Sequence, residues 1–414
     1  MKILHVTAHL GGGVGKAHAA IGRALPKAIE RTFVLLEPPR DRRHAAAIEA
    51  SGTPVVVARG LDNVADLAAG ADIVQFEFWN HPRLFECLAR TSFPKMRSAF
   101  WSHISGLFRP VIQPGLIEQA DRFVFSTEAS HAARGCDLLP QSAKQKLAVI
   151  NSGFGFADRP TRARPRRRPP VIAYLGTVDS VKMHPGFFDA IDRLDGNDIR
   201  VDVWGAVAGP VAAQARAMRH PQRIRFGGET AAPAVALSDA EIFFYPLQRE
   251  HYGTAENALI EAMSLGLVPV VLDNPAELAI VQHGKTGFVG HSIEACAETL
   301  QHLLSAPDLL ERMSGHAVRH IADTRTPARS AQAFLDLWRE LLSEPARRPD
   351  FRGVIGDNPA EWFLATQCLP GELWRPPPAA IDPEQPAKGM LAHFESVFPR
   401  DSSLSRLAGV PGNA

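Results

Sequence analysis

The sequence predicts an α/β protein with two doubly wound parallel-sheet domains facing a cleft, followed by an irregular C-terminal extension. Its 414 residues exceed the ~250–300 residues at which a single core stops growing, so two domains are expected. Short β-rich runs alternate with amphipathic stretches, which implies βαβ units around parallel sheets. This alternation stops at residues 157–170 and starts again at residue 171, which indicates a domain boundary there.

The N-terminal domain is predicted over residues 1–156. Helical patterns lie between its strands, for example at 15–29 and 113–120. The predicted strands are 2–7, 32–36, 54–57, 72–76, 98–102, 122–126 and 147–150.

Residues 157–170 read as an interdomain linker, because proline and six arginines of like charge disfavour packing. The second domain is predicted over 171–343. Its strands are expected at 171–176, 199–204, 223–227, 241–245 and 268–272, and its helices at 186–194, 210–218, 255–265, 275–282, 293–304 and 327–343.

Residues 344–414 form a Pro-rich C-terminal extension with helical patterns near 388–397 and 403–408. Trp362, Phe363 and Trp374 give it enough apolar mass to pack onto something else. We therefore expect an appendage wrapped over the domains, not a third core.

The composition is that of a soluble globular protein, with 45% hydrophobic and 21% charged residues. A net charge of +1 argues against a nucleic-acid partner, and no apolar run approaches the ~18 residues that span a bilayer. The chain starts directly with a strand and shows no signal peptide, and its four cysteines form no C-x-x-C pair. We expect free thiols, no metal site and a cytoplasmic location, with peripheral contact to the inner face of a membrane left open.

The first βα turn contains Gly11, Gly12 and Gly13. Glycines let a backbone approach a ligand, and the following helix offers free N–H groups to an anion, so Gly12 and Gly13 are predicted to bind substrate. A Walker A loop is the rival interpretation. It fails because Leu10 occupies the first required glycine position and Ala17 replaces the Ser or Thr that holds Mg²⁺. A tight turn without any ligand is the other alternative.

His103 follows an apolar strand that ends at Ser102. A side chain at the carboxyl end of a parallel strand points into the ligand crevice of such a sheet. His103 is therefore a candidate to hydrogen-bond a sugar hydroxyl, although a lone histidine there is often structural.

In the second domain, Gly176 and Thr177 end the first strand, and Lys182 lies in the loop that follows. A lysine there can neutralise a diphosphate leaving group as a point charge. Gly205 ends the next strand, and Gly227 and Gly228 end another, where a nucleotide base can approach the backbone. Turn chemistry explains the glycines at these two strand ends equally well.

The segment 249–270 carries most of the functional signal. Thr254 is a plausible N-cap after Gly253, and Asn257 and Glu261 lie on the same face of the helix, one turn apart. Glu261 stands in an otherwise apolar helix, where an ionised carboxylate is costly unless a partner hydrogen-bonds to it. Sugar hydroxyls are such a partner, so the segment, with Glu256 on its first turn, is predicted to bind a nucleotide sugar.

These landmarks, in this order, resemble the GT-B glycosyltransferases, in particular those of retaining family 4. The resemblance covers roughly residues 1–343. It is strongest at 259–270, Leu-Ile-Glu-Ala-Met-Ser-Leu-Gly-Leu-Val-Pro-Val, followed by 284–288, Gly-Lys-Thr-Gly-Phe. It implies two Rossmann-like domains, of which the C-terminal one binds the donor and the N-terminal one the acceptor.

The resemblance also implies residue roles. Glu261 matches the second glutamate of the family's Glu-x(7)-Glu motif, which holds the ribose. Lys182 matches the lysine that supports the diphosphate, and His103 the histidine that touches the donor sugar. Gly253 stands where the first glutamate is expected, so Glu256 is the favoured substitute. Enzymes of this kind generally need no metal or other cofactor.

Thr177 stands where the family often has arginine, so one charge is lost unless Arg249 supplies it. The resulting hypothesis is a retaining hexosyltransferase that moves a sugar from a nucleoside-diphosphate sugar to a glycan, lipid-linked or small-molecule acceptor, with surface polysaccharide assembly as a plausible role. Two alternatives are a nucleotide-sugar epimerase or hydrolase on the same scaffold and a non-catalytic protein that binds a nucleotide sugar or glycan.

Overall fold

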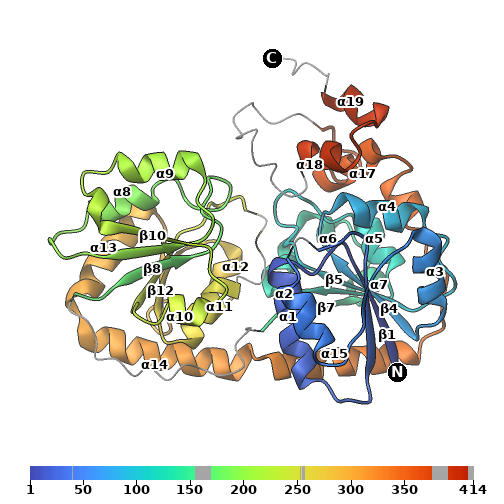
Figure 1. Ribbon diagram of the computed structural model, residues 1–414, viewed down its shortest axis with the longest axis horizontal. Helices are drawn as coiled ribbons and strands as arrows, with labels where there is room; N and C mark the ends of the chain where they lie inside the picture. Colours follow the sequence, from blue (N-terminus) through green and yellow to red (C-terminus); the bar gives the residue numbers. More distant parts are fainter. Residues whose placement is uncertain (40, 154–168, 252, 254–256, 375–389, 409–414) are drawn as a thin grey trace. The chain divides into compact units, whose positions relative to one another are not determined.

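The computed structural model describes residues 1–39, 41–153, 169–251, 253, 257–374 and 390–408. The chain divides into two compact units, which are described separately below (Figure 1). Unit 1 comprises Met1–Ser152, Tyr252–Ala255 and Ser330–Ala414, and unit 2 comprises Gly153–His251 and Glu256–Arg329. Both are α/β folds built on a parallel sheet, as predicted. Most of the predicted linker, residues 157–168, lies outside the described residues.

Unit 1 is built on a seven-stranded parallel sheet of order β3-β2-β1-β4-β5-β6-β7. The chain leaves β1 towards β2 on one side and returns to β4 on the other. The carboxyl ends of β1 and β4 therefore form the topological switch point, where ligands bind in open α/β sheets. The strands are β1 (Lys2–Thr7), β2 (Glu30–Leu35), β3 (Val55–Val57), β4 (Ile73–Phe78), β5 (Ser98–Ser102), β6 (Arg122–Phe125) and β7 (Leu147–Val149).

Apolar residues cover both faces of this sheet because its central strands are buried on both sides. Every residue of β4 and of β5 is buried. The helices among these strands are α1 (Gly12–Ala24), α2 (Arg43–Glu49), α3 (Leu61–Ala69), α4 (Pro82–Arg90), α5 (Pro114–Gln119), η1 (Glu128–Ala132), α6 (Arg134–Asp137) and α7 (Gln141–Lys144).

The end of the chain belongs to unit 1, so the division differs from the boundary predicted after residue 343. Most of α15 (Pro327–Leu342) packs under the first sheet, where Phe334 and Trp338 join the cluster of Ile3 and Trp101. The indole of Trp338 also donates to the side-chain oxygen of Gln75 at 2.9 Å. The amphipathic pattern of this helix predicts its apolar face correctly but does not show which sheet that face covers.

In the part that the structure describes, the extension adds four short helices to unit 1: α16 (Arg352–Ile355), α17 (Pro359–Gln367), α18 (Leu391–Val397) and α19 (Ser402–Ala408). Three of them, α16, α17 and α18, contact α4. Trp362 and Phe394 are fully buried in one cluster with Phe85. In its described residues, the extension completes the core of unit 1.

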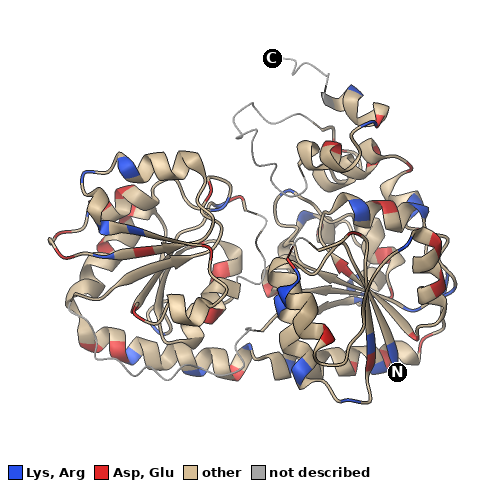
Figure 2. Cartoon of the chain, viewed as in Figure 1, with Lys and Arg blue, Asp and Glu red and all other residues tan. Residues whose placement is uncertain are grey.

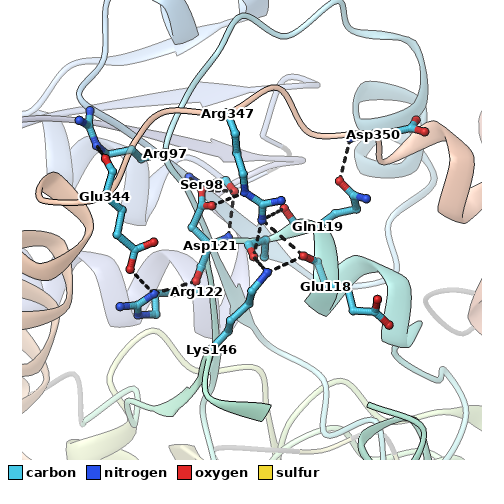
Figure 3. Close-up of polar contacts among 11 residues, drawn as sticks. Arg97, Ser98, Glu118, Gln119, Asp121, Arg122, Lys146, Glu344, Arg347 and Asp350 are labelled. Atoms are coloured by element: carbon cyan, nitrogen blue, oxygen red, sulfur yellow. Dashed lines mark hydrogen bonds and ion pairs between the residues drawn. The ribbon is translucent and has the colours of Figure 1, made fainter. Parts of the chain in front are cut away.

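Arg347 fastens the start of the extension to the sheet (Figure 3). Its guanidinium donates to the carboxylate of Asp121 at 2.5 Å and to the carbonyl oxygen of Ala120 at 2.7 Å. Lys146 donates to the carbonyl oxygens of Glu118 and Ala120, at 2.6 and 2.9 Å. Two cations therefore satisfy the open carbonyls at the C-terminal end of α5, where positive charge is favourable.

Unit 2 is built on a six-stranded parallel sheet of order β10-β9-β8-β11-β12-β13. Its switch point lies between β8 and β11. The strands are β8 (Ile172–Leu175), β9 (Val201–Trp204), β10 (Ile224–Gly228), β11 (Ile242–Tyr245), β12 (Val268–Leu272) and β13 (Phe288–Gly290). The helices are α8 (Phe187–Asp192), α9 (Gly209–Arg216), η2 (Pro221–Arg223), α10 (Pro233–Ala236), α11 (Asn257–Ser264), α12 (Pro275–Leu278), α13 (Ile293–Ser305) and α14 (Pro307–Thr324).

Charged side chains of both signs are interspersed over both units (Figure 2). Among the described helices, none is both long and apolar enough to cross a membrane. The four cysteines are free thiols, as predicted, and burial raises the pKa of Cys87 and of Cys296 to about 12. These two thiols are therefore unreactive packing residues at neutral pH.

Candidate active site

Two tyrosine rings lie at the switch point of unit 2. Tyr174 is the third of the four buried residues of β8 and Tyr245 is the last residue of β11, and their rings lie 5.3 Å apart. The Tyr174 hydroxyl donates to the carbonyl oxygen of Thr177 at 2.8 Å, which fixes the turn that follows β8. Thr177 itself is exposed. Two tyrosines thus shape the edge at which a ligand of this sheet would lie.

Lys182 is held at this edge by its backbone. Its N–H donates to the carboxylate of Asp179 at 2.9 Å, and its carbonyl oxygen accepts from the N–H of Gln248 at 2.8 Å. The loop after β8 is therefore tied to the loop after β11, across the switch point. This fixed backbone reduces the entropy that Lys182 loses when it binds a ligand.

The ammonium group of Lys182 lies 5.7 Å from the ring centre of Tyr245, within cation–π range. The side chain is half-buried. An ammonium above an aromatic face is partly desolvated, so its attraction to a phosphate oxygen is stronger than at an open surface. Lys182 and Gly176 thus both lie beside Tyr245, and the lysine is in a geometry suited to an anion.

Packing between strand ends explains Gly205. A Cβ atom on Gly205 would lie 1.9 Å from the carbonyl oxygen of Gly176, and its φ of +144° is one that other residues rarely adopt. Gly176, by contrast, would place a Cβ 3.4 Å from the nearest atoms, the Tyr174 hydroxyl and a Tyr245 ring carbon. Close backbone approach thus requires glycine at 205 whether or not a nucleotide base lies beside it.

Glu261 lies in α11 and is 1% exposed, as the apolar surroundings in the sequence indicate. Asn257, at the first position of the helix, has a buried side-chain oxygen with no hydrogen-bond partner among the described residues. Gly253 is buried. Thr254 and Glu256 lie outside the described residues, so the roles assigned to them, including that of Glu256 as the substitute carboxylate, stay predictions.

A buried histidine and carboxylate that the sequence reasoning missed lie close together near the ends of β11 and β12. His251 is 4% exposed, and its Nε2 atom lies 3.4 Å from the carboxylate of Glu277, which is fully buried. Arg249, the suggested extra cation, is exposed and lies 3.3 Å from Asp273. Glu277 stands in the first turn of α12. Its signal in the sequence is a glutamate that follows shortly after the apolar strand β12.

In unit 1, Gly12 and Gly13 are the first residues of α1 and are exposed. This helix start has no side-chain cap and no acidic residue in its first turn. Open N–H groups and the positive end of the helix dipole therefore favour an oxygen ligand there. Close packing requires glycine at position 15, because an added Cβ atom would lie 2.0 Å from the carbonyl oxygen of Leu10.

His103 lies at the carboxyl end of β5, as predicted, and its partner is a buried carboxylate. Its Nε2 atom is 3.0 Å from Oε2 of Glu77, which is also 2.8 Å from Nε2 of His18. The other oxygen of Glu77 is 2.8 Å from Nδ1 of His5 and accepts from Gln75 at 2.9 Å. One carboxylate thus organises three histidines.

Glu77 is ionised and its buried neighbours His5 and His18 are neutral. Although burial alone would raise it, the pKa of Glu77 lies well below its usual range because of the electrostatic influence of His18 and hydrogen bonds from His103, His18 and His5. Burial lowers the pKa of His5 to about 3 and also lowers that of His18. Each neutral imidazole can then donate one N–H towards the carboxylate.

Sequence reasoning missed Glu77, although its signal resembles that of Glu261. Glu77 and Gln75 are the polar residues of β4, whose other members are apolar. A carboxylate in such a strand needs partners. Those partners come from positions 5, 18 and 103, so only the folded sheet reveals them.

Comparison with known proteins gives a family match for much of unit 2. Residues 159–320 match the family described as Glycosyl transferases group 1. No curated protein matches the chain.

Solved structures match both units. A glycosyltransferase from Rickettsia africae matches with a TM-score of 0.67 at 14% identity, over 83% of this chain and 99% of that one. HepE from Anabaena, solved with UDP and glucose, matches with a TM-score of 0.64 at 14% identity, over 82% and 100%. Sucrose-phosphate synthase from Thermosynechococcus elongatus matches with a TM-score of 0.62 at 13% identity, over 83% and 100%. At these identities the likeness shows the fold, which is that of the GT-B glycosyltransferases.

Proposed function

We propose that the chain is a glycosyltransferase that transfers a hexose from a nucleoside-diphosphate sugar to a glycan, lipid-linked or small-molecule acceptor with retention of configuration. The group 1 family match over residues 159–320 and the GT-B fold support this proposal. The observation that carries this proposal is the position of Lys182 at the switch point of unit 2, 5.7 Å from the ring centre of Tyr245. A diphosphate bound there would meet a fixed positive charge.

The roles of the site residues follow from charge and burial. Lys182 would stabilise the charge that develops on the departing diphosphate, and the start of α11 would add backbone N–H donors. Glu261, buried in α11, would accept hydrogen bonds from the ribose hydroxyls. Because lysine and helix N–H groups perform the neutralisation, we propose that no metal or other cofactor is required.

In unit 1, His103 would accept a hydrogen bond from a hydroxyl of the donor sugar, held in place by Glu77. The solved structure of HepE contains UDP and glucose, which makes UDP-glucose the first donor to test. The proposed location is the cytoplasm, with the acceptor reached in solution or at the inner face of a membrane.

The test is a transfer assay with UDP-, GDP- and ADP-hexoses and a panel of alkyl glycosides, followed by NMR of the new glycosidic bond. The proposal predicts a product with the anomeric configuration of the donor, formed equally well in the presence of EDTA. An inverted product, or an epimerised or hydrolysed sugar with no transfer to any glycoside, would contradict it.

A further inference from the structure

We propose that His9, Glu37 and His81 form a binding site for the hydroxyl groups of a neutral sugar acceptor, with His393 of the C-terminal extension as one wall. These three residues follow β1, β2 and β4, whose carboxyl ends lie at the switch point of unit 1. The inference rests on the proposed glycosyl transfer and adds the chemistry of the acceptor side.

Backbone pairing brings the three residues together. The N–H of Glu37 donates to the carbonyl oxygen of Ala8 at 3.0 Å, so the ladder of β1 and β2 continues to His9. One side-chain nitrogen or oxygen atom from each of His9, Glu37 and His81 lies within 4.8 Å of the others. Nε2 of His81 is 3.3 Å from the carboxylate of Glu37.

Trp79 orients both imidazoles. The ring of His9 lies 5.1 Å and that of His81 4.7 Å from the ring of Trp79, both edge to face, and the two imidazoles are 5.6 Å apart. Trp79 is 7% exposed. A buried indole thus limits the rotation of two rings that flank one carboxylate.

Backbone hydrogen bonds indicate the tautomer of both histidines. The N–H of Gly11 donates to Nδ1 of His9 at 3.1 Å, and the N–H of Arg83 donates to Nδ1 of His81 at 3.2 Å. A nitrogen that accepts carries no proton, so in each neutral ring the hydrogen is on Nε2. Nε2 of His81 therefore donates to Glu37, and Nε2 of His9 is also a donor.

This pattern favours a hydroxyl ligand over a metal ion. A metal-bound histidine normally coordinates through one nitrogen and donates its other N–H outward, whereas both Nδ1 atoms here accept. The hydrogen bond from His81 lowers the pKa of Glu37, so the carboxylate is ionised and disfavours an anionic ligand. An ionised carboxylate beside N–H donors complements sugar hydroxyls, which both donate and accept.

The carboxylate is open to a ligand. The side chain of Glu37 is 30% exposed. Its two oxygens offer about four acceptor positions, and His81 is its one hydrogen-bonding partner among the described residues. The exposed N–H groups of Gly12 and Gly13 begin α1 just after His9 and add donors for a sugar oxygen.

The C-terminal extension supplies one wall of the proposed acceptor site. His393 of α18 lies 4.9 Å from the ring of His81, edge to face. The next residue, Phe394, is fully buried beside Phe85 and Phe363 and anchors the helix to unit 1. The guanidinium of Arg83, on α4, also stacks over Phe398 at 5.3 Å. This part of the extension is therefore well placed to contact whatever binds at Glu37.

The test is NMR of the imidazole groups in the full-length protein, titrated separately with methyl hexosides, inorganic phosphate and Zn²⁺. We expect a methyl hexoside to shift the His9 and His81 signals and the other two probes to leave them unchanged. Glu37→Gln and His393→Ala should weaken hexoside binding by about 10- to 100-fold, the size of one or two charge-assisted hydrogen bonds. Glu49→Gln, in the surface pair with Arg42, is the matched control.

A shift by phosphate or Zn²⁺, or by no hexoside in the panel, would overturn the proposal. Wild-type hexoside affinity in both variants would also overturn it. Nucleotide binding separates this outcome from failure of the proposed function: if the wild-type protein and Glu49→Gln bind a nucleoside diphosphate but no hexoside shifts the His9 and His81 signals, only the acceptor site is disproved. A protein that neither binds nucleotides nor turns over any donor would instead disprove the transferase function.

Discussion

Oε2 of Glu77 lies 3.0 Å from Nε2 of His103, and this contact determines which imidazole nitrogen is left for a ligand. Because the carboxylate is ionised, the shared proton belongs to Nε2 of His103. Nδ1 then carries a lone pair and has no hydrogen-bond partner in the described part of the chain. A sugar hydroxyl at this position would therefore donate to His103.

Glu77→Gln should disturb this arrangement without removing its volume. The glutamine amide can donate to Nε2, so His103 should populate the tautomer with hydrogen on Nδ1. Long-range ¹⁵N NMR should detect the change, and sugar transfer should fall by about tenfold or more, as when a positioned imidazole takes the wrong tautomer. Glu86→Gln, at a partly exposed position of α4 where the carboxylate pairs with Arg83, is the control. An unchanged tautomer together with an unchanged rate would exclude a positioning role for Glu77.

Glu261→Ala should abolish transfer and leave the fold intact. The carboxylate is buried in α11 and would hold the ribose, so its loss leaves the hydroxyls of the donor without their acceptor. Circular dichroism and melting temperature would establish folding. Glu298→Ala, on the exposed face of α13, should transfer sugar at the wild-type rate. A folded Glu261→Ala protein with wild-type activity would remove Glu261 from the site.

Lys182→Ala should reduce kcat by about 100-fold or more, because one leaving-group charge then lacks its counterion in a partly dry site. Lys182→Arg should recover only part of the loss, since a planar guanidinium does not reproduce a point charge above Tyr245. Steady-state kinetics with the best donor would measure both. Arg216→Ala, an exposed cation on α9, should behave as wild type; equal losses in both variants would indicate a general charge effect.

Arg347→Ala should loosen the extension. It removes the ion pair with Asp121 and the bonds to carbonyl oxygens that end α5, at a cost of about 1.5–3 kcal/mol in the free energy of unfolding. Denaturant titration would measure this cost, and limited proteolysis should show earlier cleavage after α15. Arg348→Ala, at the neighbouring position, should cost less than about 0.5 kcal/mol. Equal stability of the two variants would mean that Arg347 does not fasten the extension.

The free energy of unfolding should fall as the pH drops below about 6.5, the ordinary histidine pKa. His5 and His18 have lowered pKa values in the fold, so the unfolded chain takes up protons first as the pH falls. Each such proton contributes a slope of about 1.4 kcal/mol per pH unit, and His5 stays neutral until about pH 3. Glu77, whose pKa is lowered, adds a further loss below its unfolded pKa of about 4.3. Denaturant titrations from pH 7.5 to 5 would measure the slope, which should be shallower in His5→Gln; a flat profile would contradict the neutral buried histidines.

Much of the fold is readable from the sequence because buried parallel strands are continuous apolar runs. The predicted strands 2–7 and 268–272 coincide with β1 and β12. The sequence reasoning missed several elements, among them β13 and α14. β13 has three residues beside Gly287 and so lacks a long apolar run, and α14 carries Gly315 within a largely polar helix. The placement of α15 with unit 1 depends on tertiary packing that periodicity does not encode.

The candidate site was likewise only partly predictable from the sequence. Lys182 and Glu261 stand near motifs whose local chemistry is visible, a strand-end loop and an apolar helix. Glu77 and Glu37 act through partners distant in sequence, such as His103 and His81, which only strand order brings together. Gly205 shows a different limit: backbone packing requires glycine at this position, so the glycine by itself does not indicate a ligand.

The most direct measurement is a thermal-shift panel of UDP, GDP, ADP and ATP, with EDTA or Mg²⁺, on the wild-type protein and on Lys182→Ala. A ligand at about 100 times its dissociation constant adds about 2.7 kcal/mol of stability, which is a clear rise in melting temperature. The proposed function predicts that one nucleoside diphosphate stabilises the wild-type protein regardless of Mg²⁺ and that Lys182→Ala loses most of this shift. No shift with any diphosphate, or a shift with ATP and Mg²⁺ alone, would contradict it.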